Sequence, residues 1–185
     1  MAALVAALLV QASDRTPWLT ATLSTRFARP GAVILGTAIA LAIGNGIAAA
    51  LGAYLAPRIP LAGRDLMLAL TLVSAGGSAL FPIKLKDRLG GWKIGAFLTS
   101  LLGVATLAAG DRTQFITFAL GARSPDAAIL AAIGATIGAL AVNIPAILLG
   151  EAWYKALPMT PIRVTIGILF LIIGSIVGLG AIGLI

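Results

Sequence analysis

Ala12-Ser13-Asp14-Arg15-Thr16 recurs 97 residues later as Ala109-Gly110-Asp111-Arg112-Thr113, and these two segments decide how the chain folds. The same offset pairs Trp18 with Phe115, Thr20 with Thr117, Leu23 with Leu120, Arg26 with Arg123 and Arg58 with Lys155. An offset of 98 pairs Asn45 with Asn143 and Pro60 with Pro158. One shared tripeptide can arise by chance, but a register held over this length indicates an internal duplication.

The composition is too apolar for a soluble domain. Of the 185 residues, 60% are hydrophobic and 10% are charged, and the mean hydropathy is +1.08. A bilayer accommodates such a chain because lipid replaces water around its outer surface. Six apolar segments are each near or above the ~20 residues that cross a ~30 Å hydrocarbon core. We therefore predict an all-α membrane protein with six transmembrane helices at 2–27, 31–56, 65–83, 92–121, 127–149 and 162–184.

Three spans per copy place the two copies in opposite orientations, because three is an odd number. The linkers after spans 1, 3 and 5 hold eight Lys or Arg residues, whereas the other linkers and the termini hold three. This bias predicts both termini on the non-cytoplasmic side of a bacterial inner membrane. It also explains the net charge of +7 without a nucleic-acid partner. The predicted organisation is a first three-helix repeat at 1–83, a cytoplasmic linker at 84–91 and an inverted second repeat at 92–185.

Asp14-Arg15 and Asp111-Arg112 are the only charged residues deep inside the predicted spans. A charge there costs at least ~2.5–3.5 kcal/mol on insertion scales, so it normally faces protein or a water-filled cavity. Each aspartate lies twelve residues before Arg26 or Arg123, which is ~18 Å along a helix and predicts a position near the bilayer midplane. Two interpretations follow. The residues form a cation or proton site where spans 1 and 4 meet, or they form two structural Asp–Arg ion pairs.

Several polar side chains are further candidate ligands. The chain has no cysteine and no histidine, so a site must use oxygen ligands, which suit hard cations such as Ca²⁺, Mn²⁺, Mg²⁺ and Na⁺. Pro17 and Gly110 weaken the local helix, which either frees backbone carbonyls for a cation or makes an ordinary kink. The repeat-related Asn45 and Asn143 either complete a ligand shell or make interhelical hydrogen bonds worth ~0.6 kcal/mol each. The remaining candidates are Gln11, Thr16, Thr113 and Gln114.

The segment Leu107-Ala108-Ala109-Gly110-Asp111-Arg112-Thr113-Gln114 resembles the E-x-G-D-K/R-[ST] signature of the Gdt/transmembrane protein 165 family. Gln11-Ala12-Ser13-Asp14-Arg15-Thr16 resembles it more loosely. The resemblance implies two inverted three-helix repeats with one motif in span 1 and one in span 4. It also implies transport of Mn²⁺ or Ca²⁺ in exchange for protons. Asp14 and Asp111 are then metal ligands, with Thr16 and Thr113 beside them.

The sequence departs from that signature at the acidic positions. Gln11 and Ala108 replace the family's two glutamates, and Ser13 replaces a glycine. Two carboxylates and two arginines sum to zero, so a divalent cation leaves uncompensated charge unless Arg15 and Arg112 turn away, and its affinity should fall sharply. A monovalent ion or a weak divalent site fits this charge better. We predict a small secondary cation transporter with a midplane site, or alternatively a transport-inactive relative acting as a membrane scaffold or partner protein.

Neither an enzyme nor a bound cofactor, apart from the transported cation, is predicted. The aspartates lack the motifs of intramembrane aspartyl proteases, and serine chemistry lacks a histidine base. The expected partners are the lipid bilayer, the transported cation and protons. Gly134-Ala-Thr-Ile-Gly138 and Gly174-Ser-Ile-Val-Gly178 are small-xxx-small patterns that predict close helix packing, either within the chain or between subunits.

Overall fold

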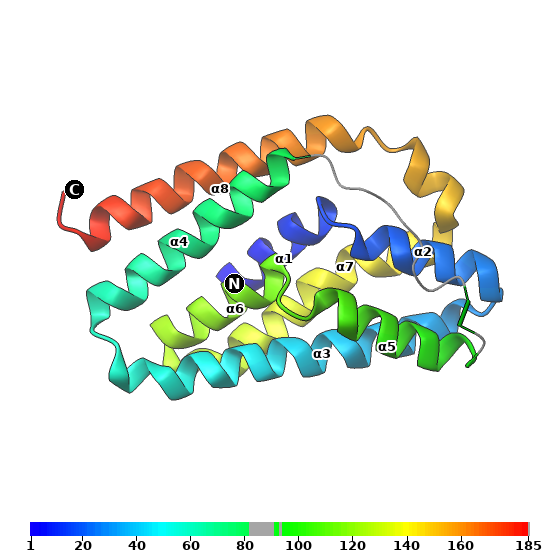
Figure 1. Ribbon diagram of the computed structural model, residues 1–185, viewed down its shortest axis with the longest axis horizontal. Coiled ribbons are helices and arrows are strands. Elements are labelled where there is room, and N and C mark those ends of the chain that lie inside the picture. Colours follow the sequence, from blue (N-terminus) through cyan, green and yellow to red (C-terminus); the bar gives the residue numbers. More distant parts are fainter. Residues whose placement is uncertain (82–90, 93, 185) are drawn as a thin grey trace.

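A computed structural model describes residues 1–81, 91, 92 and 94–184, and every regular element in this part of the chain is a helix (Figure 1). The predicted linker at 84–91 falls mainly outside the described residues. The all-α prediction is therefore confirmed for the described chain. The helices are α1 (Ala2–Ala12), α2 (Thr16–Phe27), α3 (Pro30–Leu55), η1 (Ala56–Arg58), α4 (Leu61–Leu80), α5 (Ala96–Ala108), α6 (Arg112–Arg123), η2 (Pro125–Ala127), α7 (Ala128–Ala156) and α8 (Met159–Ala181).

Two of the predicted spans are broken rather than continuous. The segment predicted at 2–27 consists of α1 followed by α2, and the segment predicted at 92–121 consists of α5 followed by α6. The continuous helices predicted there are therefore wrong, because each motif interrupts the helix that carries it. Within the described residues, three helices are long and apolar enough to cross a bilayer by themselves: Pro30–Arg58, Pro125–Ala152 and Met159–Ala181.

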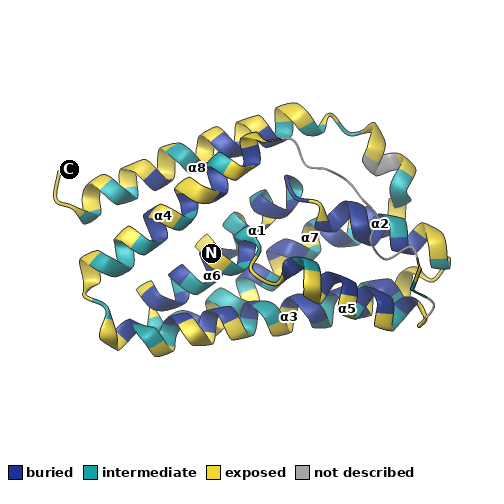
Figure 2. Cartoon of the chain, in the orientation of Figure 1, coloured by how far each residue is buried: buried dark blue, intermediate teal, exposed yellow. Residues whose placement is uncertain are grey.

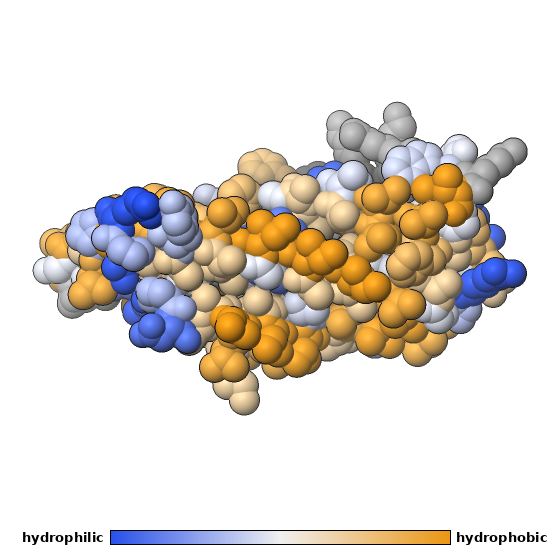
Figure 3. All heavy atoms as spheres, turned by 90° about the horizontal axis from the view of Figure 1, so that it is seen from below, coloured by the Kyte–Doolittle hydropathy of each residue, from blue (hydrophilic) through white to orange (hydrophobic). Residues whose placement is uncertain are grey.

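The surface has the distribution of polarity that a membrane protein requires. The helices run mostly along the long axis of the molecule (Figure 1). On the face shown in Figure 3, apolar side chains cover most of the middle, and the strongly hydrophilic residues gather toward the two ends. An apolar middle between polar ends matches the hydrocarbon core of a bilayer and its two interfaces.

The helices of the two sequence copies pack against each other rather than separately. α1 lies on α7, α5 lies on α3, α2 lies on α7 and α6 lies on α3. The long helices α3 and α7 contact each other, and α4 pairs with α8 along one side of the bundle (Figure 1). Much of the outer surface of α8 is exposed, whereas α2 is largely buried (Figure 2). The motif-bearing half-helices therefore lie in the interior, between the two copies.

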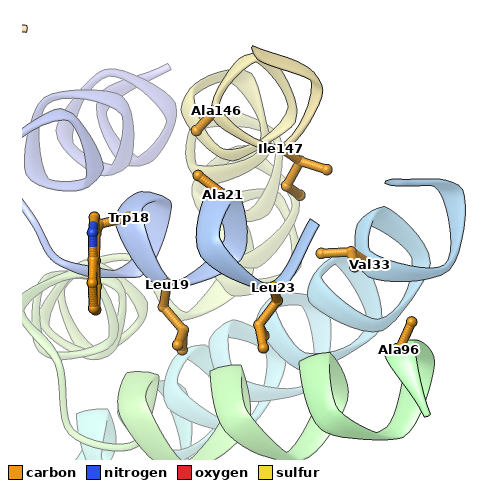
Figure 4. Packing of buried hydrophobic residues seen from close by; sticks show 8 residues of the cluster. All are labelled: Trp18, Leu19, Ala21, Leu23, Val33, Ala96, Ala146 and Ile147. Carbon is orange, nitrogen blue, oxygen red and sulfur yellow. The ribbon is translucent and has the colours of Figure 1, made fainter. Parts of the chain in front are cut away.

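The short helix α2 is held by packing on several sides. Its buried residues Trp18, Leu19, Ala21 and Leu23 join a cluster with side chains from α3, α5 and α7 (Figure 4). Those partners are Val33, Ala96, Ala146 and Ile147. Inside a bilayer, close van der Waals contact of this kind drives helix association, because lipid removes most of the hydrophobic driving force. This packing fixes the first motif, which lies directly before α2.

Glycines mark the closest helix crossings. A Cβ at Gly36 on α3 would lie 2.6 Å from the backbone oxygen of Phe97 on α5. The repeat-related Gly134 on α7 faces Leu4 on α1, and Gly138 is pressed against the same residue. Gly174 on α8 faces Val73 on α4. The two small-xxx-small patterns therefore pack within the chain.

The adjacent residues Gly76 and Gly77 on α4 test this packing directly. A Cβ at Gly76 would lie 2.7 Å from the backbone oxygen of Gly167 on α8, whereas a Cβ at Gly77 meets no atom within 4 Å. Gly76→Leu should lower the free energy of unfolding by about 1–3 kcal/mol, because the α4–α8 crossing cannot admit a side chain. Gly77→Leu should leave it nearly unchanged. Thermal unfolding of both variants in detergent measures the difference, and equal losses would contradict the described crossing.

Candidate functional site

The first helix break frees a backbone carbonyl at the first motif. Pro17 stands in the first turn of α2 and has no N–H to donate to the carbonyl oxygen of Ser13, four residues earlier. The Ser13 hydroxyl donates to the Val10 carbonyl at 2.9 Å, which closes the end of α1. The Asp14 carboxylate accepts the backbone N–H of Arg15 at 2.8 Å. The Ser13 carbonyl is therefore available to a donor from elsewhere in the fold.

The second break is built differently. Gly110 has φ +73, a left-handed conformation that favours glycine. Asp111 then caps α6, and its Oδ1 accepts the backbone N–H of Gln114 at 2.8 Å. The Gln114 side chain reaches back and accepts the Gly110 N–H at 3.1 Å. This reciprocal arrangement resembles a capping box and orients the second aspartate at the start of α6.

The two breaks meet through Arg112. Its Nη2 lies 3.4 Å from Oδ1 of Asp14 and donates to the Ser13 carbonyl at 3.1 Å. The free carbonyl of the first break is therefore bound by the arginine of the second. Arg15, the repeat-related arginine, is exposed. Of the two Asp–Arg pairs that the structural interpretation anticipated within the motifs, the described residues form one, Arg112 with Asp14, and it joins the two copies.

Asp111 is the second acidic group of the site. Its Oδ2 is buried and has no hydrogen-bond partner among the described residues. Asp14 and Arg112 are both close enough to interact with it electrostatically. Unpaired buried oxygen atoms are costly, and they are found where an ion, a proton or a water completes the site. Asp111 Oδ2 is therefore the clearest open ligand position.

A chain of neutral hydrogen bonds runs beside the aspartates and joins four helices. Thr20 on α2 donates to the side-chain oxygen of Asn143 on α7 at 3.2 Å. Asn143 donates to Gln11 Oε1 on α1 at 3.1 Å, and Gln11 donates to Thr113 Oγ1 on α6 at 3.2 Å. All four side chains are buried. Thr20 is not among the ligands predicted from the sequence, although its polar side chain and its repeat partner Thr117 would have indicated it.

The remaining candidate residues divide into near and distant ones. Thr16 is the last residue of the first motif, and its buried hydroxyl has no partner among the described residues. Gln114 packs on the α3 backbone, where a Cβ at Gly44 would collide with its amide. Asn45 is buried but donates to Thr136 on α7 at 3.2 Å. No hydrogen bond among the described residues joins Asn45 to the aspartates, so its contact is the interhelical bond that the sequence offered as an alternative.

The two asparagines should therefore differ when they are replaced. Asn143→Ala removes the central member of the buried chain and leaves Gln11 Oε1 without its donor, whereas Thr20 keeps its bond to the Pro17 carbonyl. The expected loss is about 1–3 kcal/mol of unfolding free energy, because a buried acceptor becomes unsatisfied. Asn45→Ala breaks one bond to Thr136 and should cost about 0.6 kcal/mol. Thermal unfolding of the two variants compares them, and a larger loss for Asn45→Ala would contradict this difference.

The donors gathered here suit a hard cation but provide little negative charge. Among the described residues, no group of three or more His, Cys, Asp or Glu side chains forms a metal cluster. The available ligands are carboxylate, amide, hydroxyl and carbonyl oxygens, which hard cations prefer. With Arg15 exposed, Asp14, Asp111 and Arg112 give the site two formal negative charges and one formal positive charge. Such a site can hold a cation weakly or exchange it for a proton.

Comparison with known proteins agrees with this chemistry. The family model described as "Divalent cation/proton antiporter GDT1" matches residues 1–87 and 96–183. A protein of Vibrio cholerae serotype O1 (strain ATCC 39541 / Classical Ogawa 395 / O395), named "Putative manganese exporter", is 30% identical over 168 residues. That match covers 89% of this chain and 82% of the relative. No solved structure matches the chain. The chain belongs to the divalent cation/proton antiporter GDT1 family, which is a family of membrane transporters and not of enzymes.

Proposed function

We propose that this protein exchanges a divalent cation, Mn²⁺ in the first place, for protons at a site between two inverted three-helix repeats. The observation that carries the proposal is the meeting of the two motif breaks, where Arg112 of one copy contacts Asp14 and Ser13 of the other. Intramembrane carboxylates beside interrupted helices are typical of ion-coupling sites in secondary transporters. The neutral chain through Gln11 and Asn143 supplies further oxygen atoms next to them.

The packing supports the six-span inverted repeat. The contacts of α1 with α7 and of α5 with α3 are equivalent under the sequence register, as are those of α2 with α7 and of α6 with α3. The repeat-related glycines Gly36 and Gly134 stand at the first pair of contacts. The two segments matched by the family model, 1–87 and 96–183, also agree with repeats at 1–83 and 92–185. In this arrangement α1 with α2, and α5 with α6, each form one interrupted span near the bilayer midplane.

The choice of Mn²⁺ rests on two observations. The Vibrio cholerae relative is named for manganese export, and the site offers only oxygen ligands to a cation. Ca²⁺ is the second divalent candidate because it prefers the same ligands. The charge bias of the linkers favours a bacterial inner membrane with both termini on the non-cytoplasmic side. Movement of Mn²⁺ out of the cytoplasm against protons entering it would then be export.

One observation favours a second function. Gln11 and Ala108 stand at the acidic positions of the family signature, and Arg112 occupies Asp14. A site in which an arginine of the chain already neutralises a carboxylate fits a transport-inactive membrane scaffold. Replacement of both aspartates would then change the stability of the protein but would not change ion flux.

A test in cells separates these two functions. The chain is expressed in a bacterium that lacks its manganese exporter, and intracellular manganese is measured by mass spectrometry during growth in added Mn²⁺. We expect the wild type to lower intracellular manganese and restore growth, and the Asp14→Asn/Asp111→Asn variant to behave like the empty vector. Asp126→Asn, on the exposed helix η2, is the matched control and should retain activity. An inserted wild-type protein that leaves manganese at the level of the empty vector would contradict the proposal.

A further inference from the structure

The two copies of the motif have the same sequence Asp-Arg-Thr but different surroundings. Arg112 is directed inward to Asp14, whereas its counterpart Arg15 is exposed. The second motif is also less buried, because Gly110 is exposed and Asp111 is half-buried, whereas their counterparts Ser13 and Asp14 are buried. The residues that follow show the same difference: Trp18 is 7% exposed and its counterpart Phe115 is 53% exposed. The first motif is therefore more deeply buried than the second in the described conformation.

The repeat register defines what the opposite conformation would contain. Arg112 binds Oδ1 of Asp14 and the carbonyl of Ser13. The equivalent partners of Arg15 are the carboxylate of Asp111 and the carbonyl of Gly110. In the described conformation Asp111 Oδ2 is buried without a hydrogen-bond partner, and no ion pair joins Arg15 to another described residue. The second pair is thus absent from the described conformation, although both of its members are present.

We propose that Arg112 and Arg15 are tethered counter-ions that alternate: Arg112 occupies Asp14 in the described conformation, and Arg15 occupies Asp111 in the opposite one. This inference rests on the proposed transport function. Each conformation then has one carboxylate covered by an arginine and one exposed to a transported cation or proton. Exchange of the two ion pairs accompanies the movement of one copy against the other, which is how inverted repeats expose a site to each side in turn.

This exchange also addresses the charge of the site. An arginine remains protonated in proteins, so it cannot leave a carboxylate by losing its proton. A transported cation must displace it by binding the same carboxylate. The arginine therefore competes with the cation in one conformation and leaves the other carboxylate free. Arg15 and Arg112 act as positioning residues that set the relative stability of the two conformations.

Spin labels can measure this balance because the chain contains no cysteine. Introduced cysteines at Arg29 and Ala156 report one end of the molecule, and cysteines at Ile59 and Asp126 report the other. The two label pairs are related by the offset of 97, and each joins the first copy to the second. Double electron–electron resonance in liposomes gives the distance distribution at each end for the wild type, Arg112→Gln, Arg15→Gln and the double variant.

Arg112→Gln should change the ratio of the two conformations about fivefold or more, with one end widening while the other narrows. Arg15→Gln should shift the ratio in the opposite direction, and the double variant should return toward the wild type because both pairs are lost. Arg112→Lys keeps the charge but loses the forked donor, so it should shift the ratio less and in the same direction as Arg112→Gln. Arg112→Lys therefore tests the inference if Arg112→Gln does not fold. Unchanged distributions, or shifts of both single variants in one direction, would overturn the inference.

Cation flux by the same proteins separates this inference from the proposed function. If the two arginine variants shift the ratio of conformations in opposite directions but the wild type moves no cation, the exchange of ion pairs is supported and transport is rejected. A wild type that transports cations but shows no shift in either arginine variant would reject the exchange and leave transport standing.

Discussion

Replacing both aspartates, as Asp14→Asn with Asp111→Asn, is expected to reduce cation flux in proteoliposomes about 100-fold or more, because it removes both negative charges that can hold the cation. Asparagine has nearly the same shape as aspartate and keeps an oxygen that can cap α6 in place of Asp111 Oδ1. The fold should therefore survive, although Arg112 loses the ionised partner that it has at 3.4 Å. The measurement is uptake of ⁵⁴Mn²⁺ into liposomes that contain equal amounts of inserted protein.

Asp65→Asn is the control for this double replacement. Asp65 pairs with Arg123 at 2.7 Å, far along the helices from the motif breaks. Its replacement also removes a carboxylate from an arginine, but it should leave flux within about twofold of wild type, because exposed pairs contribute little. Equal losses of flux in Asp65→Asn and in the double variant would indicate a general effect of charge removal. Full flux in the double variant would exclude the two aspartates as the site.

Gln11→Glu is expected to increase the apparent affinity for Mn²⁺ about 100-fold, because it adds a charge beside the cation in a site of low dielectric constant. The structure allows this change without rearrangement. Oε1 of Gln11 already accepts from Asn143. The hydroxyl of Thr113, which now accepts from Gln11, can rotate and donate to the new carboxylate. The substitution restores one of the two acidic positions of the family signature.

The concentration dependence of Mn²⁺ uptake measures this gain. Gln11→Met, which has a similar volume and no charge, is the control and should not increase the affinity. Na⁺ should gain less than Mn²⁺ from Gln11→Glu, because the added Coulomb energy scales with the charge of the ion. An unchanged Mn²⁺ affinity in a folded Gln11→Glu protein would place the bound cation away from Gln11.

The helical character of the chain and the positions of its long helices could largely be predicted from the sequence, but the pairing of the helices was not. Apolar segments of sufficient length located the membrane helices, and the repeated motif indicated that the chain contains two related units. The breaks at Ser13 to Arg15 and at Gly110 were less predictable, since the apolar pattern continues through them. Pro17 and Gly110 gave the only local signals, and each signal is also compatible with a simple kink. In the structure each of these segments is interrupted and consists of two separate half-helices.

The partners inside the site could not be predicted, for a physical reason. Both motif copies read Asp-Arg-Thr, so the motif itself does not indicate which arginine turns inward. That choice depends on the conformation of the whole molecule, because Arg112 needs the Ser13 carbonyl that Pro17 leaves free. The difference in hydrogen-bond partners between Asn143 and Asn45 also depends on the surrounding structure. The two are equivalent in the register, but Gln11 has a side chain that reaches Asn143, whereas its counterpart Ala108 has none for Asn45.

The most direct test of cation/proton exchange is a coupled-flux measurement in sealed proteoliposomes that contain the wild-type protein and a trapped pH dye. An imposed Mn²⁺ gradient should move protons in the opposite direction, and an imposed proton gradient should drive ⁵⁴Mn²⁺ uphill. Both movements should be absent from protein-free liposomes. Manganese movement that neither causes nor responds to proton movement would contradict exchange, and no movement of Mn²⁺, Ca²⁺ or Na⁺ through correctly inserted protein would contradict transport itself.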